Sequence, residues 1–235
     1  MQSIEAKAPH TGPAASRRYA GRGMPQTDWF RRTSWSDLEE HDFFERLDKS
    51  RSPLHRSQYL RLQAVSLLQT RQPRLIRVAL RLLEVLVSGT PDPSELAAAH
   101  LHAAECYDRL GDFTRAAEQF RLSLQAWEAF PAVDVGCALA FPWFVARHGM
   151  SDLYDEALST LDKAETVFPV QIFREAAVRA MIADDRGDRP AAAQHARRAL
   201  DAAGFRKSAS NRPSSLGLVG PEFREVIDRL GRLVG

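Results

Sequence analysis

The chain has 235 residues, of which 44% are hydrophobic, and a formal net charge of +2, so it can bury a sizeable core without disulfides. Its two cysteines, Cys106 and Cys137, form no CxxC pair, which indicates neither a disulfide framework nor a zinc knuckle and favours a reducing, cytoplasmic location. No stretch approaches the roughly 18 apolar residues that cross a bilayer, so we expect no membrane partner.

The first 32 residues have the composition of a disordered basic tail. Six Lys and Arg residues stand there against Glu5 and Asp28, which gives a charge of +4 and leaves −2 for the remaining chain. A nucleic-acid-binding domain usually carries a basic stripe on a folded face. A basic tail on a non-basic body therefore gives little support to nucleic acid as a partner, and residues 33–235 are expected to form a single helical domain.

A first helix is expected to begin at Ser36. The segment Ser36-Asp37-Leu38-Glu39 matches a capping box, in which the hydroxyl accepts a free N–H and the glutamate reaches back. Trp35 is placed to pack against this turn, and Phe43 needs a cover from elsewhere in the chain.

From residue 54 onward, apolar residues recur with helical periodicity, and turns containing Pro, Gly or Asp separate the blocks. No strand is expected. Helices are predicted near residues 55–69, 73–87, 94–110, 113–129, 137–148, 151–167, 171–186 and 189–203. Because the connections are short, consecutive helices should pack antiparallel, as hairpins over 55–87, 94–130, 137–168 and 171–204.

The hairpins recur at a period of about 35 to 41 residues, which is typical of a helical solenoid. The second helices of the first and third hairpins share one spacing: a small residue, a large apolar residue four positions later and a proline eight after that. The residues are Ala79, Leu83 and Pro91, and Ala157, Leu161 and Pro169. A further copy contains Tyr107, Gly111, Asp112, Phe113, Ala116 and Phe120, with a late Pro131. Residues 54–204 thus resemble degenerate tetratricopeptide repeats.

Several departures from that family's pattern predict an irregular array. The family's first-helix Trp and Leu-Gly are missing, and Pro142 falls within the third hairpin's first helix. A proline in mid-helix removes a backbone bond and bends the chain. The interpretation we favour is that Pro142 begins the helix proper and that Trp143 and Phe144 belong to the core. After Gly204 the chain becomes polar and basic, and a last helix over 221–234 is expected to cap the array.

No motif identifies a reaction, because the sequence has no phosphate-binding glycine loop, no GxSxG and no HExxH. His102, Glu105 and Cys106 lie within about one helical turn, where a metal half-site or a thiol–imidazole pair is conceivable. Packing within the repeat explains them equally well, and the acidic turn at 184–188 does not have EF-hand spacing. We therefore expect no catalytic residue, no metal and no cofactor.

The resemblance implies that the first helix of each pair lines a groove for a peptide or protein segment. The residues that this geometry would place at a partner are Glu105, Asp108, Arg109, Arg174, Met181, Asp184 and Asp185, with Arg147 and His148 between them. The first hypothesis is a scaffold that binds a protein partner, with a homodimer through an incompletely capped end as a further expectation. The alternatives are an immunity or regulatory protein that neutralises an enzyme or toxin, and a metal-dependent or hydrolytic enzyme.

Overall fold

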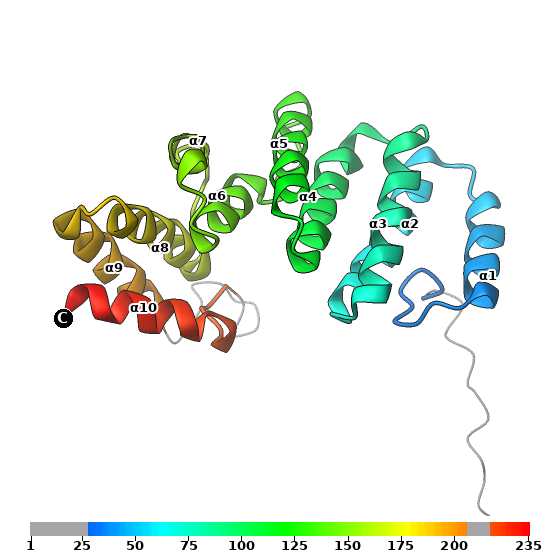
Figure 1. The fold of residues 1–235 in the computed structure, drawn as a ribbon. Helices are drawn as coiled ribbons and strands as arrows, with labels where there is room; N and C mark the ends of the chain where they lie inside the picture. The colour runs from blue at the N-terminus through cyan, green and yellow to red at the C-terminus, as the bar shows by residue number, and fades with distance from the viewer. Residues whose placement is uncertain (1–27, 206–216) are drawn as a thin grey trace, which may run out of the picture.

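The computed structural model describes residues 28–205 and 217–235, and within these ranges the chain is all-helical. Its ten α-helices are α1 (Asp37–Asp48), α2 (Pro53–Gln69), α3 (Pro73–Ser88), α4 (Pro93–Leu110), α5 (Phe113–Ala129), α6 (Cys137–Arg147), α7 (Tyr154–Leu161), α8 (Pro169–Asp185), α9 (Arg189–Ala203) and α10 (Arg224–Val234). They follow one another along an array that runs from α1 to α10 (Figure 1). No helix in the described ranges is long and apolar enough to cross a membrane.

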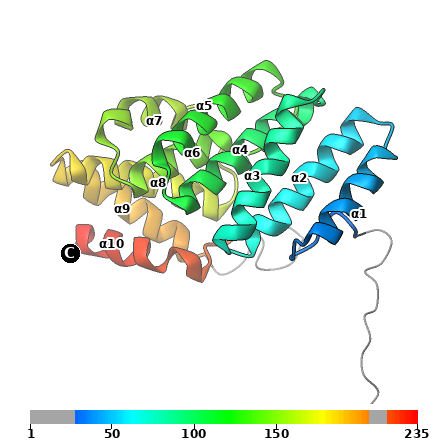
Figure 2. The same cartoon turned by 45° about the vertical axis from the view of Figure 1, so that its right-hand side comes forward.

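Helix pairs are the unit of this array. The helices α2 and α3, α4 and α5, α6 and α7, and α8 and α9 pack against each other, and the first helices of successive pairs are also in contact. The last helix, α10, packs on α9 and α8 and covers the C-terminal end (Figure 2). The expected all-α fold of stacked hairpins in a solenoid-like array is therefore confirmed.

The helix ends follow local signals in the sequence. At α1 the expected capping box is present, because Glu39 donates its backbone N–H to the Ser36 hydroxyl at 3.3 Å and its carboxylate accepts the Ser36 N–H at 2.8 Å. Asp112 accepts the Arg115 N–H at the start of α5 at 3.1 Å. Just before it, Gly111 ends α4 with φ of +78°, a left-handed conformation that glycine adopts without strain.

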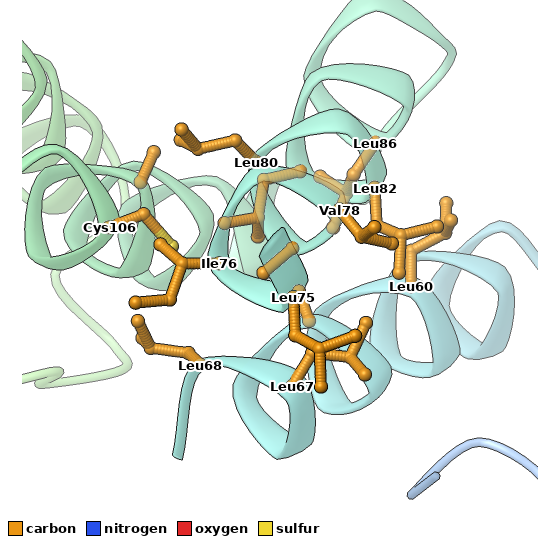
Figure 3. Packing of buried hydrophobic residues seen from close by; sticks show 14 of the residues in the cluster. Leu60, Leu67, Leu68, Leu75, Ile76, Val78, Leu80, Leu82, Leu86 and Cys106 are labelled. Atoms are coloured by element: carbon orange, nitrogen blue, oxygen red, sulfur yellow. The ribbon is translucent and has the colours of Figure 1, made fainter. Parts of the chain in front are cut away.

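The pairs are held by two kinds of core. Between α2, α3 and α4, large aliphatic side chains interdigitate: Leu67 lies beside Leu75, and Ile76 lies beside Cys106 (Figure 3). Between α8 and α9 the buried residues are mostly alanines, namely Ala176, Ala177, Ala180, Ala196, Ala199 and Ala202. Small side chains let two helices approach closely, so α8 and α9 pack against each other with few bulky side chains between them.

The third hairpin differs from its prediction at two places. The expected helix over 151–167 is replaced by a 3-10 turn at Ser151–Leu153 and the short α7. Phe168 is extended, with φ of −92° and ψ of 148°, since a residue before a proline avoids the helical region. Pro142 does not begin a helix, because α6 starts at Cys137 and continues through the proline to Arg147.

The segment 28–32, which composition assigned to the disordered tail, lies on the helical body. Trp29 packs against Phe43 with ring centroids 5.3 Å apart, and it supplies the cover that Phe43 was expected to need. The Arg32 backbone N–H donates to the Gln63 side-chain oxygen at 3.0 Å, and the Gln63 amide donates to the Arg32 carbonyl at 2.8 Å. The boundary at residue 32 is therefore wrong, and residues 1–27 lie outside the described ranges.

The buried Gln63 predicts how strongly this segment is attached to α2. Replacement of Gln63 by Ala removes both bonds to the Arg32 backbone, and we expect the free energy of unfolding to fall by about 1–3 kcal/mol. Urea denaturation followed by circular dichroism measures the change. The exposed Gln69 on the same helix gives the matched control, since Gln69→Ala should change stability by less than about 0.5 kcal/mol. Equal losses in the two variants would contradict this role of Gln63.

Candidate functional site

A hollow with a volume of about 440 Å³ opens between the first helices of three successive pairs. Its side chains come chiefly from α4 and from α6 with its adjoining His148, and α5 and α8 contribute one residue each. The residues that line it are Glu105, Asp108, Arg109, Phe120, Ala140, Trp143, Phe144, Arg147, His148 and Arg174. Volumes of about 300–1,000 Å³ are usual for ligand sites, so the hollow is large enough to receive a side chain or a short segment.

The α4 side of the hollow carries Glu105, Asp108 and Arg109, which share a face because they are three and four residues apart. Arg109 reaches back to the end of α2, where its Nη1 donates to the Leu68 carbonyl at 2.6 Å. Glu105 Oε2 lies 3.2 Å from Nδ1 of His102. These bonds fix the last turns of α4 and hold both charged groups in place.

The α6 side is joined to α4 by His148, the C-cap residue that directly follows α6. Its Nε2 lies 2.7 Å from Oδ1 of Asp108, and its ring lies 4.2 Å, centroid to centroid, from that of Phe113. Arg147 is exposed and has no ion pair among the described residues. The carboxylate of Asp108 is thus engaged by an imidazole, while the neighbouring guanidinium is left without a carboxylate.

Arg174 of α8 closes the hollow from the third side. Its guanidinium carbon lies 5.3 Å from the ring centroid of Trp143, and its Nη2 makes one long hydrogen bond of 3.5 Å to the Leu139 carbonyl. Its Nε is buried and has no hydrogen-bond partner within the described ranges. Burial lowers the pKa of Arg174 to about 10; the charge of Glu105 opposes this shift, and Arg147 adds to it. Arg174 is therefore protonated at neutral pH, and no carboxylate of the described residues forms an ion pair with it.

The structure brings together six of the nine residues that the sequence indicated, namely Glu105, Asp108, Arg109, Arg147, His148 and Arg174. The prediction that Met181 faces the groove is wrong, because this residue is 2% exposed and lies in the core that α6 and α7 form with α8. Whether the six bind a partner stays a prediction.

Asp184 and Asp185 lie away from the hollow and bind the C-terminal helix. Arg229 of α10 approaches Asp184 Oδ2 at 3.2 Å and Asp185 Oδ1 at 2.8 Å. The Tyr154 hydroxyl also donates to Asp185, and burial, followed by this hydrogen bond, raises the pKa of Tyr154 to about 12. The two aspartates therefore attach α10 and α7 to α8. These contacts within the fold explain the two acidic residues, and no contact with a partner protein is needed.

The hollow also contains residues that the sequence did not assign to a site. Phe144 is 3% exposed and belongs to the core, as expected, but Trp143 is half-buried and lies under Arg174. Its position four residues before Arg147 places it on the same face of α6. That spacing is the signal that could have assigned Trp143 to the hollow.

The thiol considered for an enzyme is inaccessible. Cys106 is fully buried, and burial, with a smaller effect from the charge of Glu105, raises the pKa of its thiol from the ordinary value of 9.0 to about 12. A nucleophilic or metal-binding cysteine requires the thiolate, which this site disfavours. Among residues 28–205 and 217–235, no group of three or more His, Cys, Asp or Glu side chains is placed to hold a metal ion.

Comparisons of the chain with known protein families, with curated proteins and with solved structures found no match.

The raised pKa of Cys106 predicts a loss of stability in alkali. The unfolded thiol ionises near pH 9 and the folded one near pH 12, so unfolding releases a proton between these values and the free energy of unfolding falls as the pH rises through this window. We expect Cys106→Ala to show a shallower fall between pH 8 and 10.5 than the parent protein, measured by urea denaturation at each pH. Parallel profiles would show that Cys106 is readily ionised in the folded state.

Proposed function

We propose that this chain is a helical-repeat interaction module that binds a segment of a protein partner in the hollow between α4, α6 and α8. The observation that supports it most directly is the meeting of charged side chains from three successive first helices around one opening. Three of them, Arg109, Arg147 and Arg174, have no carboxylate partner among the described residues, and Arg109 is bonded to the Leu68 carbonyl instead. Guanidinium groups that face an opening without a carboxylate partner can bind an acidic group of another protein.

The resemblance to tetratricopeptide repeats supports the same proposal. In that family the first helices of the pairs line the peptide groove, and α4, α6 and α8 are the first helices of their pairs here. The buried free thiols of Cys106 and Cys137 fit a reducing compartment, and we place the module in the cytoplasm. An immunity or regulatory protein is one version of this function, since it too must hold a partner on its surface.

A charge reversal at the exposed rim of the hollow tests the proposal. We expect the parent chain to retain one stoichiometric protein from a lysate of its native host, and Arg147→Glu to lose it, because the reversal places a negative charge where the partner is bound. Mass spectrometry identifies the protein, and titration calorimetry with the purified partner measures the loss, which should be at least about tenfold in Kd.

The matched control is Arg77→Glu, which reverses an exposed arginine on α3 outside the hollow and should bind as the parent does. Reversal of Asp184 and Asp185 is unsuitable, because it would break the contacts to Arg229 that hold α10. Equal retention by the parent and Arg147→Glu would remove the hollow from the interface, and retention of no protein by the parent would count against a binding module.

A further inference from the structure

Arg174 makes fewer hydrogen bonds to the described residues than a largely buried guanidinium usually makes. A guanidinium carries five N–H donors, yet the structure gives Arg174 a single long bond of 3.5 Å to Leu139, and its buried Nε has none. Buried polar groups in native proteins almost always have partners, and an exception points to a bound water, ion or ligand. Among the described residues, Arg174 therefore lacks acceptors for most of its N–H donors.

The carboxylates around the hollow are already engaged elsewhere. Glu105 is bonded to His102 and Asp108 to His148. Glu175, the neighbour of Arg174 in sequence, pairs with Arg179 at 2.5 Å and Arg198 at 2.9 Å. No ion pair reaches Arg147 or Arg174 within the described ranges, so both guanidinium groups can accept an added anion as a partner.

The indole of Trp143 keeps Arg174 at the hollow. The guanidinium carbon lies 5.3 Å from the ring centroid, and stacking of this kind orients a guanidinium without using its N–H donors. The donors that lack partners are thus held ready for an acceptor. An arginine with such an arrangement is suited to bidentate recognition of carboxylate or phosphate.

We propose that Arg147 and Arg174 together bind a phosphate monoester carried by the partner segment. This inference rests on the proposed function and specifies the chemistry of the segment. Arg147 and Arg174 offer the N–H donors of two guanidinium groups to one hollow, whereas Arg109 is bonded to the Leu68 carbonyl. A phosphoserine or phosphothreonine supplies three acceptor oxygens and a charge of about −1.5 to −2, so both guanidinium groups can bind it at once, whereas one carboxylate has only two oxygens to share between them.

The stability of Arg174→Met separates binding from a structural role. If Arg174 served the fold, its removal would lower the Tm. If it serves an anion, replacement of a buried and unpaired charge by an apolar chain of similar length leaves the Tm unchanged or raises it, while binding is lost. Arg77→Gln on α3 is the control for removal of an arginine charge outside the hollow.

The ligand test uses N-acetyl-O-phosphoserine amide with the full chain at constant ionic strength. We expect the indole N–H resonance of Trp143, identified by its absence in Trp143→Phe, to shift on titration. Arg174→Met and Arg147→Gln should weaken this binding at least about tenfold, and Arg77→Gln should leave it unchanged. The same titration with N-acetyl-glutamate amide should give a much smaller shift.

Three results would overturn the inference. They are the absence of a shift with the phosphorylated probe, an equal shift with the glutamate probe, and a lowered Tm for Arg174→Met. If the parent chain still retains its partner after phosphatase treatment of the lysate, binding through a phosphate monoester is contradicted, while the proposed function is not. If no bait retains a protein but the phosphorylated probe binds, the failure lies with the proposed function instead.

Discussion

The burial of the apolar face of each helix pair against the next pair is the constraint on which the rest of this array depends. Between α8 and α9 the contact is made by residues such as Ala177 and Ala196, both fully buried, and a larger group there would force the helices apart. One pair cannot cover its own apolar face, so each pair packs on the next. The first helices α4, α6 and α8, which line the hollow, are in contact through this stacking of the pairs.

The irregular third pair shapes the hollow. Its first helix contains Pro142 and its second helix, α7, has only eight residues, so α7 offers a shorter packing face than the second helices of the other pairs. Polar contacts supplement it on the outer side, where Arg121 of α5 makes two hydrogen bonds to Glu156 of α7 at 2.8 and 2.6 Å. On the inner side, α6 presents Trp143 to Arg174 of the next pair.

The charged residues of the array fall into two groups. Arg229 and Arg121 are paired with carboxylates of other helices, and they join elements that are far apart in the sequence. Arg147 and Arg174 have no such partner in the described part of the chain. An unpaired charge that is largely removed from solvent, as in Arg174, costs stability, and proteins keep such groups mainly where function requires them. The distribution of partners, more than the number of charges, therefore points to the hollow.

The sequence by itself determined the helices and much of the hollow. The capping box at Ser36 and the glycine at 111 are local signals, encoded within a turn or two, and they placed the ends of two helices. The resemblance to tetratricopeptide repeats indicated six of the residues that line the hollow. Only the tertiary structure decided that Met181 is core and that Asp184 is bound by Arg229. Burial and ion pairing depend on which distant segment packs nearby, here 45 residues along the chain, and no local pattern specifies that neighbour.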